Sequence, residues 1–551
     1  MMDFLKKNYL LIFILLIATA LRFVKLGSIP VGFNDDEAAF GYNAFSILKT
    51  ARDEWGRFLP FSVFESFGDW KLVGYLYLTV ISQFFFGVNE FATRLPSALF
   101  GVFAVFATYL LSQRLFDKRV ALVATLLLAI SPWHIAASRN AFESDLLVFF
   151  ITIATYFFMK GFQNPKWLTA SFVTYAVSFY IYRSSWLFMP LFVIALIYFH
   201  WDQLKKFKGI LTRNLIISLF LLVPLVPVAA TFHGQSRFFQ ESFIAGIART
   251  GINNVINEQR GTCMQKFPNA VCLISYNKVL VFSKIYLNNY FGNLSIKTYF
   301  DNANSTGFQS FATRSVLYLF ELPLIILGLI FLFKAKSPAL RIIVPWMAFF
   351  PLGAAIAGVG NYGRINLFMP VPQIVAAYGL VAMFFYLKNN FLRTIYVFLF
   401  SILIIISTVG FISDLFVVDA YFTSRYQRYG YKELFKYLAS KEQEYDKFVI
   451  SRKIDYGHQY MQYLYFSKVD PNFFLVNAKR HKSDEGWVIF DSIGKYDFVD
   501  SIPGIDRLPA KTLIVAGEKE IEFPKPPTYT IDDLRGDRIF EVYDVSQVKI
   551  P

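Results

Sequence analysis

Residues 32–71 read GFNDDEAAFGYNAFSILKTARDEWGRFLPFSVFESFGDWK and lie just past the first apolar segment of the chain. The stretch opens with three consecutive acids, Asp35, Asp36 and Glu37, and aromatic residues then recur every few positions among its charges. Ionised carboxylates lose hydration beside a bilayer unless something compensates them. The first interpretation is an ordinary solvated loop. The density of aromatic side chains favours instead a segment along a membrane interface, where carboxylates can act on a lipid head group.

The composition is typical of a protein with many membrane-spanning helices. Of the 551 residues, 55% are hydrophobic, 19% are aromatic and 17% are charged, with 64 phenylalanines. The net charge of +15 comes largely from lysine and arginine in short loops between apolar runs. That distribution indicates orientation in an anionic membrane and argues against nucleic-acid binding. We therefore predict a polytopic α-helical membrane protein.

Eleven apolar runs are long enough to cross the hydrocarbon core, given the usual spread of tilt. They lie at about residues 9–25, 95–113, 119–134, 145–160, 167–182, 186–200, 210–230, 315–333, 341–358, 366–387 and 393–413. A twelfth run at residues 72–86 is shorter, and its placement decides the topology.

The positive-inside rule chooses between the two topologies. With the N-terminus in the cytoplasm and residues 72–86 as an interfacial or re-entrant helix, the short basic loops all lie inside. If residues 72–86 crossed, the same loops would lie outside. We expect about 11 transmembrane helices plus interfacial helices in the plasma (inner) membrane. The outer face then receives residues 27–94, 131–144, 182–185, 231–314, 358–364 and everything after about 413.

Two domains are expected. Residues 1–413 form the transmembrane domain, with outer loops 27–94 and 231–314, and residues 414–551 form an extracytoplasmic soluble α/β domain. The second part is polar, with a predicted helix at residues 431–440. Its strand-like runs, separated by Gly, Pro and Asp turns, are KFVIS, NFFLV, WVIFD, TLIVAG and RIFEVYDV. Roughly 135 residues suffice for one core.

The two cysteines, Cys263 and Cys272, lie in the long polar loop 231–314. We expect a disulfide between them if this loop faces an oxidising compartment, and two free thiols otherwise. Near the N-terminus, a signal peptidase could cut after residues 18–20, which read ATA. The acidic segment close behind favours an uncleaved anchor.

A second acidic segment, SPWHIAASRNAFESD at residues 131–145, falls on the same outer face. It brings His134, Arg139, Glu143 and Asp145 to the point where the chain re-enters the membrane. A carboxylate there is either a charge that stabilises a helix start or part of a site shared with Asp36.

Further outer-face cations lie at helix ends: Lys71, Arg183 beside Tyr182, and Arg364. A lone arginine in such a place usually reaches for lipid phosphate. As a group beside the acids, these cations could bind the phosphate of a substrate lipid, since guanidinium matches phosphate oxygens bidentately. The sequence contains no nucleotide-binding loop, HExxH, CxxC pair or zinc-ligand spacing.

Four motifs make the chain resemble a family 39 type glycosyltransferase of the GT-C superfamily, the class of protein O-mannosyltransferases and bacterial aminoarabinose transferases. They are the acidic pair Asp36-Glu37, D-x-K-x-x-G-Y at residues 69–75, R-L-P-S-A-L-F-G at 94–101 and S-R-x-A-x-E at 138–143. The resemblance covers roughly the first 200 residues. Leu72-Val73 stands where many relatives have Pro-Pro, and residues 361–364 read NYGR where some have a His-Ala-Leu-Arg-like motif.

The resemblance implies transfer of a hexose or pentose from a polyprenyl-phosphate carrier to an acceptor hydroxyl on the outer face, with inversion. Asp36 would be the general base, and Glu37 and Glu143 would orient the acceptor or support the base. Orientation of donor or acceptor would involve Asp35, Asp145, His134 and Tyr182. The departing lipid phosphate would be bound by Lys71, Arg139, Arg183 and Arg364.

The implied partners are a polyprenyl-phosphate sugar donor, a glycan, lipid or protein acceptor, and membrane lipids. No obligatory cofactor is expected, although a divalent cation on Asp36 and Glu143 is chemically feasible. Two alternatives stay open: a GT-C transferase that uses a diphosphate-linked or larger donor with a metal, and a non-catalytic membrane transporter or scaffold.

Overall fold

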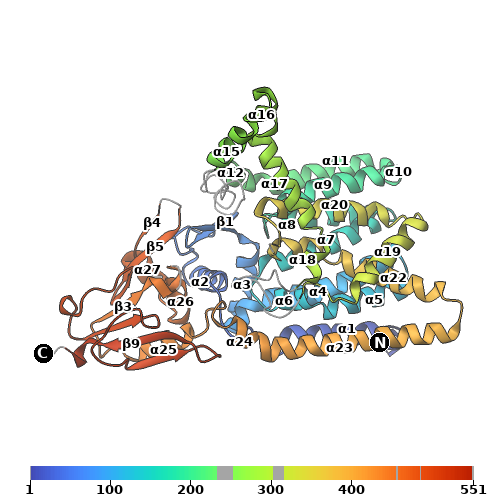
Figure 1. Cartoon of the computed structure of the whole chain (residues 1–551). Coiled ribbons are helices and arrows are strands. Elements are labelled where there is room, and N and C mark those ends of the chain that lie inside the picture. Colours follow the sequence, from blue (N-terminus) through green and yellow to red (C-terminus); the bar gives the residue numbers. More distant parts are fainter. Residues whose placement is uncertain are drawn as a thin grey trace.

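The computed structural model describes residues 2–231, 252–301, 315–360, 362–454, 457–483 and 486–548. Two parts lie end to end (Figure 1), an α-helical body and, at the other end, a mixed sheet formed by the C-terminal residues. Parts of the predicted loop 231–314, and Asn361 of the NYGR motif, lie outside the described residues.

The helices of the body follow the apolar runs of the sequence. Up to residue 231 they are α1 (Met2–Phe23), α2 (Asp35–Thr50), α3 (Val73–Phe86), α4 (Glu90–Leu115), α5 (Lys118–Ile130), α6 (Pro132–Ser138), α7 (Glu143–Gly161), α8 (Lys166–Ser178), α9 (Ser185–Phe199), α10 (Trp201–Leu204), α11 (Lys208–Leu222) and α12 (Val226–Ala230). Later come α15 (Ile252–Met264), α16 (Asn269–Ser275), α17 (Lys278–Gly292), α18 (Ile296–Phe300), α19 (Glu321–Lys334), α20 (Leu340–Ala357), α21 (Tyr362–Ile365), α22 (Val371–Tyr386), α23 (Asn390–Ser413) and α24 (Asp419–Thr423).

The length and apolar composition of its helices indicate that this is an integral membrane protein. By length and composition, six helices of the described residues can cross a membrane, or seven when α5 and α6, which meet at 59°, count as one bent span. Each of the eleven predicted runs contains a helix, but several of these helices are short. The span count, the direction of insertion and the placement of α3 therefore stay predictions.

Small residues let the helices of the body approach closely. At the crossing of α19 and α22, a Cβ on Gly328 would lie 2.1 Å from the Val375 carbonyl oxygen, and one on Gly379 would lie 2.1 Å from the Leu324 oxygen. Close backbone approach through small residues is the usual way in which membrane helices pack. The core around α4, α5 and α7 is a continuous cluster of buried apolar side chains.

The first outer loop is folded, and it contains strands that we did not predict. After α2, strand β1 (Val63–Ser66) pairs antiparallel with β2 (Asp69–Leu72), with Phe64 opposite Lys71. Gly68 closes the hairpin at φ +93°, a conformation that favours glycine. A Cβ there would also lie 2.4 Å from the Gly486 carbonyl oxygen, so the hairpin tip touches the C-terminal sheet.

The C-terminal sheet has seven strands in the order β4-β5-β6-β3-β7-β9-β8. They are β3 (Lys447–Ser451), β4 (Lys479–Lys482), β5 (Val488–Ile493), β6 (Tyr496–Val499), β7 (Thr512–Ala516), β8 (Tyr529–Asp532) and β9 (Arg538–Asp544). Strand β3 runs parallel to β6 and β7, and the other pairs are antiparallel. Side chains alternate between two cores: Phe448 and Ile450 face one, and Val449 faces the other.

The helices of this part are α25 (Tyr431–Ser440), α26 (Gln459–Phe466) and α27 (Pro471–Asn477). The helix predicted at residues 431–440 is confirmed. The strand predicted at NFFLV is wrong, because these residues lie in α27. Pro471 occupies the first turn, and the Asp470 side chain accepts hydrogen bonds from the N–H groups of Asn472 and Phe473. Such a cap starts a helix, and a short apolar run cannot by itself be told from a strand.

The sheet and the first outer loop share one hydrophobic core. Phe33, Tyr42 and Phe67 of the loop pack in the same cluster as Tyr460 and Phe490 of the C-terminal part. The predicted domain boundary near residue 413 falls where α23 continues through a π-helical turn (Asp414–Val418) into α24. The C-terminal sheet is therefore fastened to the loop that carries the acidic triplet.

Candidate active site

Helix α2 begins at the acidic triplet because Asn34 caps it. The Asn34 side chain accepts a hydrogen bond from the Glu37 N–H (3.0 Å), and Glu37 Oε2 accepts one from the Asn34 N–H (3.1 Å). This reciprocal capping box satisfies two N–H groups that a helix leaves unpaired. Acids in the first turn also complement the helix dipole. Each of the three carboxylates then meets a different partner.

Glu37 is fully buried and joins the two acidic segments. Arg94 of α4 donates from Nε to Oε1 (2.8 Å) and from Nη2 to Oε2 (3.0 Å), and the Ala141 N–H donates to Oε1 (2.9 Å). Arg94 also donates to the carbonyls of Leu26 and Pro30. Both carboxylate oxygens are thus engaged, and the geometry makes Glu37 a structural link between the loops.

Asp36 lines a cavity, and 30% of its side chain is exposed. Lys71 of β2 donates from Nζ to Oδ1 at 2.7 Å. Lys71 is itself buried; it also pairs with Asp69, and its ammonium lies 4.5 Å from the centre of the Phe67 ring. A buried ammonium needs such carboxylates, because an unpaired buried charge is costly. The hairpin therefore brings one cation to Asp36.

Asp35 faces the C-terminal part of the chain. Arg428 donates from Nη2 to Oδ2 (2.8 Å), Gln462 donates to Oδ1 (3.2 Å), and His458 Nδ1 lies 3.6 Å from Oδ2. Burial would raise the pKa of Asp35, but the hydrogen bond with His458 and the charge of Arg428 outweigh it and hold the pKa well below its usual range. Asp35 is thus an ionised, locked contact between α2 and the C-terminal residues.

The second acidic segment forms a wall of the same cavity. The residues of this segment that line it include Asn140, Ala141 and Phe142. Glu143 follows them as the first residue of α7, and its side chain is buried. The two acidic segments therefore meet. The Ala141 N–H joins the second segment to the first, because it donates to Glu37 Oε1.

Asp145 and His134 lie in the interior of the body. Asp145 Oδ1 is 3.7 Å from His134 Nε2, and His134 Nδ1 is 2.6 Å from Arg22 Nη2 of α1. All three side chains are fully buried. They tie α1, α6 and α7 together, and none of them lines the cavity.

The four cations that were predicted to bind phosphate lie at different places in the fold. Arg139 is buried and donates to the carbonyls of Leu21, Val24 and Ile29 (2.8–3.0 Å). It therefore binds carbonyl groups at and just beyond the C-terminal end of α1. Lys71 lies at the hairpin as described above.

Arg183 lies beside that hairpin, since its Nη2 donates to the Trp70 carbonyl (2.8 Å). Tyr182, next to it, is half-buried. Arg364 is half-buried in α21, a helix packed against α7 and α20. Lys71 and Arg183 are therefore the two of the four that the hairpin brings together.

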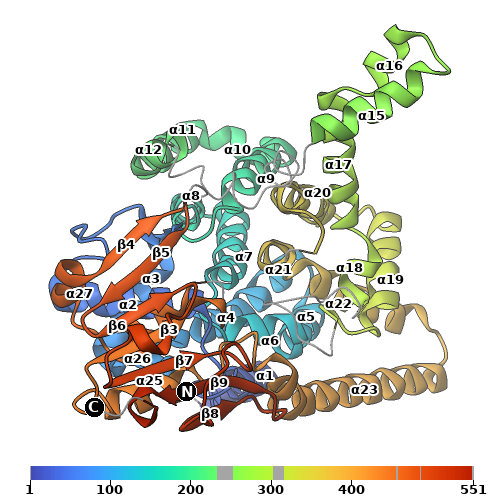
Figure 2. The same ribbon diagram turned by 60° about the vertical axis from the view of Figure 1, so that its left-hand side comes forward.

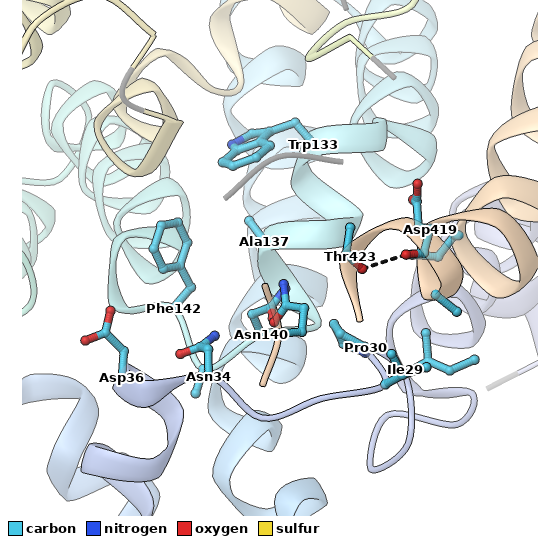
Figure 3. Close-up of a pocket in the computed structure, with 15 residues that line it drawn as sticks. Ile29, Pro30, Asn34, Asp36, Trp133, Ala137, Asn140, Phe142, Asp419 and Thr423 are labelled. Carbon is cyan, nitrogen blue, oxygen red and sulfur yellow. Dashed lines mark hydrogen bonds between the residues drawn. The ribbon is translucent and has the colours of Figure 1, made fainter. Parts of the chain in front are cut away.

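The cavity beside Asp36 is walled by three segments far apart in sequence (Figure 3). These are residues 29–36, residues 133–142 and the linker 415–428 that follows α23, of which residues 415–427 line the cavity. In the close-up, Asp36 and Asn34 stand opposite Asp419 and Thr423, with Trp133 at one end. The empty volume is about 740 Å³, part of it open to solvent.

The lining is mainly apolar, and none of the described residues that form it is Lys, Arg or His. Its polar side chains are Asn34, Asp36, Asn140, Asp419, Thr423 and Gln427. Amide, hydroxyl and carboxylate groups between apolar walls fit a neutral, hydroxyl-bearing group better than a phosphate. Within the described part of the chain, no three His, Cys, Asp or Glu side chains are grouped as metal ligands.

Several residues of this site escaped the sequence analysis. Asp69 and Arg94 stand inside the motifs D-x-K and R-L-P-S, so their partners could have been sought there. Arg428 and Gln427 follow the last apolar run with no pattern that singles them out. Their place at the site depends on how the C-terminal part packs, which no local signal reveals.

Comparison with known proteins points to one class. A family model described as dolichyl-phosphate-mannose-protein mannosyltransferase matches residues 73–227. YkcB of Bacillus subtilis (strain 168), named as a candidate mannosyltransferase, is 36% identical over 104 residues, which are 18% of this chain and 14% of YkcB. YycA of the same organism, named likewise, is 28% identical over 153 residues, 27% of this chain and 22% of YycA. The matches thus span less than a quarter of these relatives.

Solved structures show the same fold at low sequence identity. An Archaeoglobus fulgidus oligosaccharyltransferase tethered to an acceptor peptide aligns with a TM-score of 0.53 and 13% identity, over 84% of this chain and 64% of that one. ArnT from Cupriavidus metallidurans bound to undecaprenyl phosphate aligns with a TM-score of 0.50 and 13% identity, over 97% and 98% of the two chains. Residues 73–227 are thus similar to the mannosyltransferase family model, and the chain as a whole has a fold similar to that of the archaeal oligosaccharyltransferase and of ArnT.

Proposed function

We propose that this protein is an inverting membrane glycosyltransferase that moves a sugar from a polyprenyl-phosphate carrier to an acceptor hydroxyl on the outer face. The observation that carries the proposal is the position of Asp36. Of the three consecutive acids, Asp36 lines the cavity described above, whereas Asp35 and Glu37 are held in buried contacts. The matched family and the undecaprenyl phosphate bound by ArnT support a lipid-phosphate donor.

Asp36 would act as the general base. Lys71 binds Oδ1, so Oδ2 can take the proton of the acceptor hydroxyl as its oxygen attacks the anomeric carbon. The new bond forms on the face opposite the phosphate, the bond from the anomeric carbon to the phosphate oxygen breaks, and its electron pair leaves with the lipid phosphate. One displacement of this kind inverts the anomeric configuration.

The two cations at the hairpin would hold the departing phosphate. Lys71 is already placed against Asp36, and Arg183 is fixed by the Trp70 carbonyl beside it. Positive charge aimed at an oxygen that gains negative charge lowers the barrier without a proton transfer. The cavity that Asp36 lines, whose described lining carries no cation, would admit the acceptor. Donor and acceptor would thus approach the base from different sides.

The proposal includes the topology. About eleven spans with a cytoplasmic N-terminus would put the acidic segments, the hairpin and the domain 414–551 on the outer face, within reach of lipid-linked sugars. Since the ammonium of Lys71 occupies the place beside Asp36 that a cation would take, we propose that no metal is obligatory.

A donor screen tests the proposed reaction. The purified protein in lipid vesicles is given radiolabelled sugar on a polyprenyl monophosphate or a polyprenyl diphosphate, with membrane extract as the source of acceptor, with and without EDTA. We expect sugar transfer from the monophosphate alone, undiminished by EDTA, with a product of opposite anomeric configuration. Transfer from the diphosphate, or loss with EDTA, would favour the metal-dependent alternative. No transfer from either donor would favour a transporter or scaffold.

A further inference from the structure

Helices α15, α16 and α17 form an arm that the proposed reaction does not use. In Figures 1 and 2 the arm leads away from the helical body, crosswise to α23. Cys263 and Cys272 form a disulfide that links α15 to α16. Arg260 of α15 also donates to the Tyr276 carbonyl, from Nη2 at 2.8 Å. The arm is therefore a closed unit rather than an open loop.

The base of the arm is fixed to the C-terminal half of α20. Three side chains of α17 donate to main-chain carbonyls of that helix: Tyr290 to Ala348 (2.7 Å), Tyr286 to Leu352 (3.1 Å) and Asn289 to Ala355 (3.0 Å). These bonds use the C-terminal half of α17. They leave its N-terminal half and α16 to project from the body.

The projecting part exposes large apolar side chains. Val279 is 73% exposed and Ile274 is 68% exposed, and between residues 264 and 280 the others are Met264, Phe267, Val271, Leu273 and Leu280. Contiguous apolar surface of this kind marks a protein or membrane contact. The segment Asn269–Gly292 is apolar enough for a membrane span, yet it lies crosswise to α23 in both views.

The charge of the arm and its attachment to a candidate membrane span indicate what its exposed apolar side chains contact. The arm, residues 252–292, carries four basic residues, Arg260, Lys266, Lys278 and Lys284, and one acid, Glu258. Lys266 and Lys278 flank the apolar residues of the tip. The arm is also attached to α20, which exposes apolar side chains such as Val344 and belongs to the candidate membrane spans. Apolar residues bordered by cations are the pattern of an interfacial helix on anionic lipid.

We propose that this disulfide-closed arm lies flat in the lipid interface, with the α16 end immersed below the head groups and its lysines bound to anionic lipid. Lipid, rather than a protein partner, is the occupant because the arm is bonded to α20, a candidate membrane span that also exposes apolar side chains. The inference is independent of the catalytic proposal, since no residue of the arm lines the cavity beside Asp36.

Spin-label depth measurements on the full-length protein test this. A nitroxide is placed at Ile274→Cys, with Val279→Cys as a second site and Gln259→Cys on the polar helix α15 as the matched control. The protein is reconstituted in phosphatidylcholine vesicles with or without phosphatidylglycerol, under non-reducing conditions. We expect the labels at 274 and 279 to be reached by oxygen and protected from a polar nickel chelate, at a depth just below the phosphates. The label at 259 should be reached by the chelate.

The lysines are tested in the same vesicles. The double variant Lys266→Gln/Lys278→Gln should move the label at 274 toward water in vesicles with phosphatidylglycerol and should not move it in pure phosphatidylcholine. Labels at 274 and 279 as open to the chelate as that at 259 would overturn the proposal. A depth at the middle of the bilayer would overturn it as well, because the segment would then be a span. A lysine effect equal in both lipids would refute the anionic-lipid contact.

Discussion

Successive residues of an α-helix point about 100° apart, and this rotation gives the three acids at the start of α2 different surroundings. Asp35 binds Arg428 of the linker, Asp36 borders the cavity beside Lys71, and Glu37 is buried against Arg94. Three neighbouring carboxylates thus serve as an anchor, as the proposed base and as a structural link. Apart from the family resemblance, the sequence does not distinguish the three acids, because it shows their spacing and not their partners.

Lys71 should be needed for the rate of transfer. Lys71→Gln leaves Asp36 and Asp69 without their shared cation, and we expect transfer to fall by about 10²-fold or more, the usual effect of losing an electrostatic stabiliser. Lys71→Arg, which keeps the charge, should recover part of the rate. Steady-state kinetics with the monophosphate donor measure this, with Lys49→Gln at an exposed ion pair as the control. A wild-type rate in Lys71→Gln would contradict the role given to this lysine.

Glu37 should matter for stability. Glu37→Gln leaves the fully buried Arg94 without a charged partner, and breaking a buried pair costs about 3–5 kcal/mol. We expect a clear drop in the thermal unfolding midpoint of the vesicle-bound protein. Glu444→Gln, at an exposed pair with Lys441, should change it little, since surface pairs contribute roughly 0–1 kcal/mol. Equal midpoints for the two variants would show that the pair is not a structural link.

At the scale of elements, the site consists of the start of α2, the β1–β2 hairpin, residues 133–142 and the linker 415–428. The apolar helices and the C-terminal strands could be predicted, because hydropathy and side-chain period are local properties. The hairpin could not, since its ten residues carry aromatic and charged side chains without strict alternation. The role of the linker could not be predicted either, because Arg428 and Asp35 are 393 positions apart and their contact exists only in the folded chain.

The contact between the linker and α2 predicts a dependence of stability on acid. The pKa of Asp35 is lowered in the folded state, so its ion pair stabilises the protein above the pKa of an unfolded aspartate, about 4, and this stabilisation is lost as the pH falls further. In Arg428→Gln we expect a lower unfolding midpoint at pH 7 and a shallower decline in acid. Thermal unfolding across a pH series measures both, and Arg428→Lys should restore part of the difference. A decline as steep as that of the wild type would contradict the contact.

On the scale of the whole molecule, the C-terminal sheet is part of the site's support. Its residues share a hydrophobic core with the first outer loop, and Arg480 of β4 lies 3.5 Å from the centre of the Trp55 ring. The sequence correctly indicates an α/β region after the last apolar run, but it shows no reason for the region to pack on the acidic loop. That reason is the complementary surface of the loop, which the hairpin and α2 create together.

The packing of the C-terminal sheet on the first outer loop should weaken as the pH rises toward neutrality and above. Burial raises the pKa of Glu54 to about 7, although Arg480 and the hydrogen bonds from Asn43 and Ser66 lower it. A carboxyl group with a raised folded pKa favours the folded state below its unfolded pKa, and this advantage is lost as the pH rises through 7. We expect Glu54→Gln to lose less thermal stability than the wild type between pH 5 and 8. An unchanged pH profile would show that Glu54 is not the titrating group.

The most direct test of the account compares Asp36→Asn with Asp35→Asn in the same vesicles, by the rate of sugar transfer from the polyprenyl-monophosphate donor and by thermal unfolding. If Asp36 is the base, its amide variant stays folded, because Asp69 still pairs with Lys71, and loses about 10²–10⁴-fold in rate, the range of general base catalysis. Asp35→Asn should instead lower the unfolding midpoint and keep more of the rate. A wild-type rate in Asp36→Asn, or a loss of rate confined to Asp35→Asn, would contradict the assignment.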